Sequence, residues 1–119
     1  INQAPIPMIL DGFAAFKPRV IFINVVKTPE LVAIHQSLLT EMESSLGIID
    51  PMSKKRPFSA HLTVAYRDLT KSNFRKAWPE FKEQNLYFEF SVNQLTLLKH
   101  NGKYWDILDN FNFNQSAEL

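Results

Sequence analysis

The chain contains no cysteine, and this absence excludes disulfide bonds and thiolate zinc sites. Glycine is scarce as well, and the few glycines do not form a loop of the kind that cradles phosphate. No apolar run approaches the roughly 20 residues of a membrane-spanning helix. The N-terminal residues also lack the basic start of a signal peptide. We therefore expect a cytoplasmic protein with no membrane partner.

The chain also lacks an excess of charge of either sign. Its 13 Lys and Arg residues and 12 Asp and Glu residues leave a formal net charge of +1. No overall field therefore attracts the protein to nucleic acid or to an anionic membrane, and any RNA contact must use a local patch. An HExxH motif, a His-x-His pair and a tight carboxylate cluster are absent from the sequence too. We expect no metal site and no cofactor.

Apolar and aromatic residues are plentiful. The 119 residues are 45% hydrophobic and include ten phenylalanines, which supports a packed core and argues against disorder. This length suits one ordinary domain. We expect residues 1–119 to form a single domain.

Two apolar segments near the N-terminus predict strands. Residues 5–11 and 19–26 are rich in apolar and β-branched side chains, as buried strands are. Between them, the dipeptides Asp11-Gly12 and Lys17-Pro18 are typical of turns.

A helix is predicted over residues 29–46. Thr28 followed by Pro29 is a favourable start, because the hydroxyl can cap the helix and proline suits its first position. Apolar residues then recur at helical spacing until Gly47, a residue that commonly ends helices.

The middle of the chain predicts a loop, a strand and a second helix. Residues 50–60 contain two prolines and a basic run, as loops do, and an apolar strand follows over 61–66. The second helix starts near Thr70, and Pro79 should kink or break it. Its apolar face consists of Phe74, Ala77, Trp78 and Phe81.

The C-terminal part predicts more strands. Residues 86–92 and 94–99 have strand character, and Asn101-Gly102 is a hairpin turn signal leading into 104–108. The tail 110–119 shows little pattern, so we expect it to be partly frayed. The order of elements predicts an α+β fold, with helices covering one face of a largely antiparallel sheet.

The sharpest chemical signal is His61-Leu62-Thr63. On a strand, side chains two residues apart point to the same face, so His61 and Thr63 would present an imidazole and a hydroxyl side by side. The ring can move a proton near neutral pH, and the hydroxyl can donate to a phosphoryl oxygen. The alternative is structural: a histidine satisfied at a sheet end, and a threonine that is simply a good strand residue.

The other two histidines are weaker candidates. His35 precedes Ser37 by two residues, but on a helix these positions lie about 200° apart and cannot converge on one ligand. We expect His35 on the helix surface or at its boundary. His100 precedes the predicted hairpin turn, where we expect it to be exposed.

Several neighbours of the motif are candidate substrate contacts. Arg67 would share the face of His61 if the strand extends that far, and the small Ala65 between them would leave room for a ligand. A second set combines a basic run with two aromatic residues that can stack on a base, Lys54, Lys55, Arg56, Phe58 and Tyr66. The alternatives are a solvated loop for the basic run and core packing for the aromatic residues.

The stretch from Arg56 to Leu69, RPFSAHLTVAYRDL, resembles the second signature motif of the 2H phosphoesterases, in the 2'-5' RNA ligase-like (LigT-like) branch. That motif is His-x-Thr/Ser on a central strand. Similarity extends in the same order to residues 12–22, the 29–46 helix and 95–99, although His61-x-Thr63 alone is sharp.

The resemblance implies a bilobed, pseudo-symmetric fold with two such motifs, whose histidines face each other across a cleft. Only the second motif is present here. We therefore expect residues 1–119 to be the C-terminal two-thirds of a 2H unit that lacks its N-terminal part. His61 and Thr63 should lie on the concave face of a central strand.

The implied activity is that of a metal-independent phosphodiesterase that opens 2',3'-cyclic phosphates on RNA ends or small nucleotides, or a reversible 2'-5' RNA ligase. One histidine would act as general base and the other as general acid, and His61 can be either. With a single motif, the chain alone should be nearly inactive. The competing hypotheses are a nucleotide- or RNA-binding domain without turnover, and a structural domain that kept the fold alone.

Overall fold

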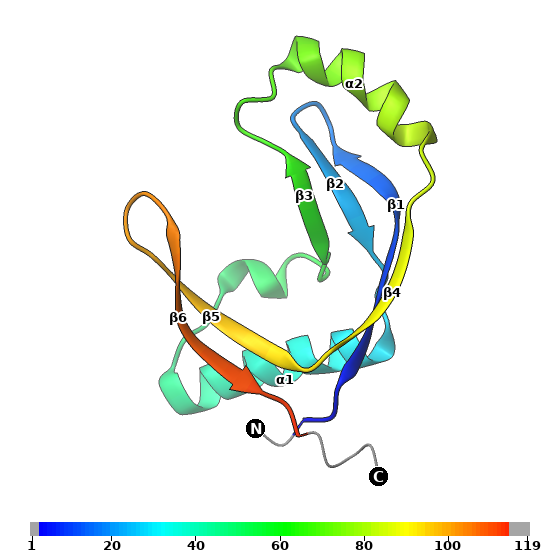
Figure 1. Cartoon of the computed structure of the whole chain (residues 1–119). Coiled ribbons are helices and arrows are strands. Elements are labelled where there is room, and N and C mark those ends of the chain that lie inside the picture. The colour runs from blue at the N-terminus through cyan, green and yellow to red at the C-terminus, as the bar shows by residue number, and fades with distance from the viewer. Residues whose placement is uncertain (1–2, 115–119) are drawn as a thin grey trace. The chain divides into compact units, whose positions relative to one another are not determined.

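The structure is a computed structural model that describes residues 3–114, without the side chains of residues 53 and 54. Within this range the chain forms two compact units. One unit comprises residues 8–90, and the other joins residues 3–7 to 91–114. Helices and antiparallel strands are combined as the α+β prediction requires (Figure 1).

Four strands form the main sheet. They are β1 (Ile6–Phe16), β2 (Val20–Val25), β3 (His61–Ala65) and β4 (Tyr87–Val92), in the order β3-β2-β1-β4. The pairs β1–β2 and β2–β3 are antiparallel. Because β2 is flanked by β1 and β3, the motif strand has one neighbour only within the described residues.

The predicted central position of the motif strand is therefore wrong for the described part of the chain. β3 lies at the edge of this sheet (Figure 1). The central position was expected from the resemblance to the 2H phosphoesterases, in which the motif lies on a central strand. The structure instead exposes Leu62 by 50% and Val64 by 46%.

The predicted turn at Asp11-Gly12 is a β-bulge inside one long strand. Leu10 pairs with Val25 and Phe13 with Ile23, so β1 has one more residue than β2 between these pairs. Gly12 has a φ of 75°, a conformation that glycine adopts without a Cβ clash. Its N–H donates to the Leu86 carbonyl at 2.8 Å.

Helix α1 spans Pro29–Leu46, as predicted. The Thr28 hydroxyl accepts from the Leu31 N–H at 3.2 Å, which satisfies one of the unpaired donors of the first turn. Gly47 ends the helix with a left-handed φ of 67°. Thr28 is itself buried, at 8% exposure.

Helix α2 spans Lys71–Glu83 after the predicted cap residue Thr70, whose hydroxyl accepts from the Asn73 N–H at 3.1 Å. The helix runs through Pro79 without a break. The sequence predicted a kink or a break at Pro79, because proline removes one backbone donor; the continuous helix excludes the break. The apolar face that contains Phe74 compensates, since its side chain is buried at 4% exposure.

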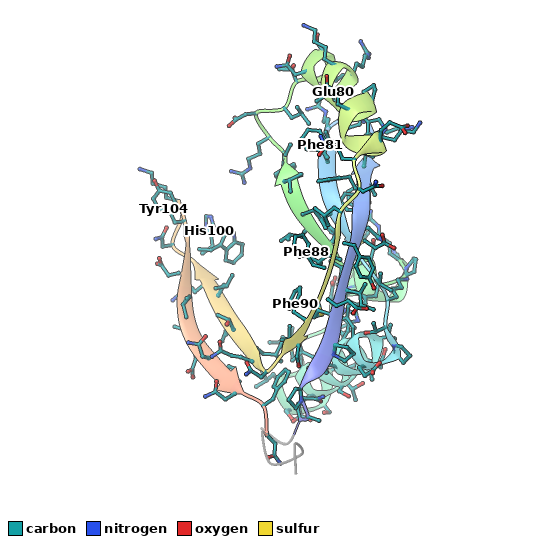
Figure 2. All side chains as sticks on the ribbon, turned by 45° about the vertical axis from the view of Figure 1, so that its right-hand side comes forward. Glu80, Phe81, Phe88, Phe90, His100 and Tyr104 are labelled. Carbon is teal, nitrogen blue, oxygen red and sulfur yellow. The ribbon has the colours of Figure 1, made fainter. Side chains whose placement is uncertain are left out.

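One face of the main sheet packs against α2. Phe81, labelled on the helix in Figure 2, meets Phe13 of β1 edge to face, with ring centroids 5.1 Å apart. Phe13 pairs with Ile23 of β2, and alternation along the strand places the buried Ile21 and Val25 on the same face as Ile23. This face holds the apolar core of the unit.

The second unit contains a hairpin of β5 (Gln94–His100) and β6 (Trp105–Asn112). Its closing pair is His100 with Trp105, so the predicted turn at Asn101-Gly102 is confirmed. The Asn101 side-chain oxygen accepts from the N–H groups of Lys103 and Tyr104, both at 2.8 Å.

The sequence predicted a partly frayed tail over residues 110–119, but the described residues of the tail are ordered. β6 extends to Asn112, and Phe113 is buried at 3% exposure. The remainder of that prediction, residues 115–119, lies outside the described residues.

Large apolar side chains are unusually exposed in the hairpin. An isolated two-stranded hairpin is at best marginally stable in water, and extensive exposed apolar surface is typical of a surface that another segment or chain covers. The exposed side chains of the hairpin are Leu97, Leu98, Tyr104, Trp105, Ile107, Leu108 and Phe111.

Candidate active site on strand β3

His61 and Thr63 lie on the face of the main sheet opposite to the one that packs on α2. In the strand register, His61 pairs with Asn24 and Thr63 with Phe22. Asn24 and Phe22 alternate with Ile23, which belongs to the α2 face. The predicted side-by-side placement of the imidazole and the hydroxyl follows from this register.

A backbone carbonyl holds the His61 ring. His61 Nδ1 lies 2.8 Å from the carbonyl oxygen of Ser59. A carbonyl oxygen can only accept, so Nδ1 carries the proton and donates it. The neutral ring then has its lone pair on Nε2, and this atom can accept a proton from a substrate or a water molecule.

Two phenylalanines pack against the same ring. Phe16 and Phe22 both lie with their centroids 5.2 Å from that of His61, at interplanar angles of 86° and 58°. The Phe22 side chain is buried, at 6% exposure, whereas the His61 side chain is exposed. The imidazole is therefore supported from below and accessible from the solvent side.

Thr63 is exposed beside His61, directly opposite the buried Phe22. A threonine hydroxyl donates one hydrogen bond and accepts others. At this position it can donate to a phosphoryl oxygen while His61 Nε2 handles a proton. The pair thus places a proton acceptor and a hydrogen-bond donor side by side on one strand.

The sequence suggested that Ala65 and Arg67 continue the face of His61 and Thr63. In the structure they do not. Ile21 pairs with Ala65 while Phe22 pairs with Thr63, so β3 contains one extra residue, Val64, between the two pairs. This bulge turns Ala65 to the α2 face. β3 then ends at Ala65, and Arg67 has a left-handed φ of 55°.

Arg67 instead contacts Tyr66, the other candidate substrate contact at this end of β3. Its guanidinium carbon lies 5.8 Å from the centre of the Tyr66 ring, within the range of a cation–π contact. Tyr66 is 57% exposed. The two residues therefore form an accessible cationic and aromatic pair beyond the end of β3.

Of the candidates before β3, Arg56 and Phe58 lie near His35 of α1. A short 3₁₀ helix, Pro51–Lys54, begins the predicted loop, and Lys55 and Arg56 are exposed after it. The Lys54 side chain lies outside the described part of the chain. Phe58 stacks on His35 of α1, with ring centroids 3.8 Å apart and an interplanar angle of 7°.

Arg56 and Phe58 share a cavity of about 200 Å³ with His35. The cavity is lined by His35, Asp50, Met52, Arg56, Pro57, Phe58 and Ser59. Ser59 connects this region to the motif, because its carbonyl oxygen holds His61. His35, expected at the helix surface or boundary, is half-buried there.

Asn24 is a further candidate for the site, one that the sequence did not point to. It lies directly across from His61, and it is exposed. Asparagine is depleted in strands, so its presence within the apolar run 20–26 was the available signal.

Among residues 3–114, no group of three or more His, Cys, Asp or Glu side chains is arranged to hold a metal ion. Neither described α-helix is long and apolar enough to cross a membrane.

Comparison with known families identifies the superfamily of the chain. The family model for the 2'-5' RNA ligase superfamily matches residues 1–103, which include both helices, the motif strand β3 and strand β5. A comparison with curated proteins finds no match. The family match covers most of the chain and includes His61 and Thr63. The chain therefore belongs to the 2'-5' RNA ligase superfamily of 2H phosphoesterases.

Proposed function

We propose that this chain provides one half of the catalytic site of a metal-independent phosphodiesterase. The enzyme opens 2',3'-cyclic phosphates on RNA ends or small nucleotides, or performs the reverse 2'-5' ligation. The observation that carries the proposal is the His61 ring, held through Nδ1 with Nε2 available, beside the exposed Thr63 hydroxyl.

The chemistry requires two proton transfers. A water oxygen attacks the cyclic phosphorus and gives its proton to the Nε2 lone pair of one histidine. The bond between phosphorus and one ribose oxygen breaks, and that oxygen takes a proton from a second, protonated histidine. His61 supplies one of these transfers and Thr63 donates to a non-bridging oxygen as negative charge develops. The reverse reaction exchanges the two histidine roles.

The second histidine belongs to the other half of the site. We propose that residues 1–119 are the C-terminal two-thirds of a 2H unit, and that a second His-x-Thr/Ser motif completes the pair. Two features support this. One histidine cannot act as base and acid in the same step, and the exposed apolar side chains of the hairpin are typical of a covered surface.

Residues at both ends of β3 are the proposed substrate contacts. Tyr66 can stack on a base while Arg67 meets a phosphate, and Phe58, Lys55 and Arg56 offer the same two functions before the strand. A cytoplasmic location is part of the proposal, supported by the cysteine-free composition.

A second candidate function is nucleotide or RNA binding without turnover. It is favoured by the single His-x-Thr motif of the 119 residues. Its binding residues would be the same, but no second proton carrier would be needed.

The decisive experiment compares the 119-residue chain with the protein encoded by the complete reading frame. Both are assayed in EDTA against an RNA with a 2',3'-cyclic phosphate end and against a 2',3'-cyclic mononucleotide. We expect hydrolysis by the complete protein and almost none by the 119-residue chain. Binding without hydrolysis would establish the second function, and loss of activity in EDTA alone would contradict the metal-free mechanism.

A further inference from the structure

We propose that a cavity beside His61 binds the neighbouring phosphate of an RNA chain, so that the preferred substrate is an RNA end rather than a mononucleotide. This inference rests on the proposed function and specifies its substrate class. The cavity lies between the end of β2 and the segment that enters β3. Its lining residues are Asn24, Val25, Val26, Lys27, Ser59 and Ala60.

The chemistry of the lining suits an oxyanion. Lys27 brings a positive charge, Asn24 an amide NH₂ and Ser59 a hydroxyl, and no acidic residue lines the cavity. The side chains of Lys27 and Asn24 are both exposed. All three groups can donate hydrogen bonds to phosphate or sugar oxygens.

The size of the cavity argues for part of a ligand rather than a whole one. Its volume is about 270 Å³. Sites that enclose a complete small molecule usually measure roughly 300–1,000 Å³. A phosphate with its attached sugar fits a space of this size.

Two residues connect the cavity to the reacting centre. Asn24 pairs with His61 across β2 and β3, and residues directly opposite in antiparallel strands have Cβ atoms about 5 Å apart. Ser59 lines the cavity, and its carbonyl oxygen accepts from His61 Nδ1 at 2.8 Å. A phosphodiester at His61 and Thr63 would therefore have the cavity beside it, where its next nucleotide can lie.

The wall of the cavity is held before any ligand arrives. The Val26 N–H donates to the Ile9 carbonyl at 2.9 Å, and the Thr28 N–H donates to the Val26 carbonyl at 2.9 Å. Thr28 also caps α1. The backbone on both sides of Lys27 is therefore fixed, so binding there orders little more than the side chain.

The test measures the affinity of the 119-residue chain for two product analogues by NMR titration. One is a nucleoside 3'-phosphate, and the other is a dinucleotide with the same terminal nucleoside 3'-phosphate plus one internal phosphate. We expect the dinucleotide to bind about tenfold more tightly, the effect of one charge-assisted contact on a partly exposed site. Lys27→Met should remove most of this preference, and Lys27→Glu should reverse it.

Lys82→Met is the matched control, because Lys82 is an exposed lysine in the last turn of α2. It should leave both affinities unchanged. An equal loss of preference in Lys82→Met and Lys27→Met would show that only general charge matters, and would overturn the proposed subsite.

His61→Ala separates this inference from the proposed function. It should weaken both ligands, since both place a phosphate at His61. Suppose that His61→Ala weakens both ligands. If the wild-type chain then binds the two ligands equally, or if Lys27→Met keeps the preference for the dinucleotide, the subsite alone is wrong. If neither ligand binds, the subsite is again wrong, and the cyclic-phosphate assay decides the proposed function.

Discussion

His61 in the main sheet and His100 in the hairpin are both exposed strand residues with aromatic neighbours, but hydrogen bonds hold their rings in opposite ways. His61 Nδ1 donates to the Ser59 carbonyl. His100 Nδ1 accepts from the Gly102 N–H at 3.0 Å, so a neutral His100 carries its proton on Nε2.

Their surroundings differ as well. His61 packs against two phenylalanines of a four-stranded sheet, one of which is buried. His100 meets Trp105 edge to face at 4.9 Å near the closed end of the hairpin, where Figure 2 labels it close to Tyr104. Exposure alone therefore does not identify a proton carrier. The partner of Nδ1 decides which nitrogen is available and in which role.

The largest effect should come from removing His61. In the complete protein, His61→Ala should lower the turnover of a cyclic phosphate by about 10²–10⁴-fold, the usual loss for a general acid or base. His100→Ala, the matched control, should change turnover little. Steady-state rates on a 2',3'-cyclic mononucleotide measure both, and equal losses in the two variants would contradict the assignment of His61.

Two exposed strand threonines, Thr63 of β3 and Thr96 of β5, provide the next comparison. Thr63→Val removes the hydroxyl at similar volume and should cost about 10²–10³-fold in kcat if it holds developing charge. Thr96 of β5 donates to Asn110 Oδ1 at 2.9 Å, so Thr96→Val should weaken the hairpin and leave kcat nearly unchanged. A larger loss of kcat in Thr96→Val than in Thr63→Val would refute the role of Thr63.

Nitrogen-15 NMR can measure directly which ring nitrogen carries the proton in His61 and in His100. At a pH where both are neutral, His61 should show a protonated Nδ1 and His100 a protonated Nε2, because each hydrogen bond favours one tautomer by about 1 kcal/mol. The same tautomer at both histidines would remove the basis of the comparison.

The smallest effect concerns Tyr87 of β4. Its hydroxyl donates to Glu89 Oε1 at 2.6 Å, and this bond raises the pKa of Tyr87 above its ordinary value of 10.0, aided by slight desolvation and the charges of Glu89 and Asp11. A raised pKa in the folded state contributes stability below pH 10, which is lost as the pH rises through the folded value.

Glu89→Gln should lower the pKa of Tyr87 toward the ordinary value, because the charge is removed. Ultraviolet titration of tyrosinate absorbance in Tyr87→Phe and Glu89→Gln identifies the transition. An unchanged titration curve in Glu89→Gln would mean that the hydrogen bond does not set this pKa.

Much of the fold could be predicted from short segments. Helix α1 was predicted with its correct limits because Thr28, Pro29 and Gly47 act within one turn of its ends. The hairpin was predicted from Asn101-Gly102 for a similar reason. The turn predicted at Asp11-Gly12 and the possible break at Pro79 were wrong for a common reason. Local propensity suggested an interruption, and contacts with distant residues maintained the strand or the helix.

The candidate site shows the same division. His61 and Thr63 were found because strand alternation is local. Arg67 was placed on their face because the bulge at Val64 could not be anticipated from β3 alone. Asn24 was overlooked because its importance depends on the register between β2 and β3, which are separated by more than 30 residues.

The sequence by itself determined the family, the α+β class and the His61-x-Thr63 pair, because motif spacing, helix caps and apolar periodicity act over a few residues. Only the tertiary structure decided which atom of His61 is available and what lies opposite it. The Ser59 carbonyl, two residues before His61, holds its ring, while the Phe22 ring packs against it and Asn24 lies opposite it through strand pairing. The positions of Phe22 and Asn24 depend on a register between distant segments, and backbone hydrogen bonds and core burial across the whole sheet set that register.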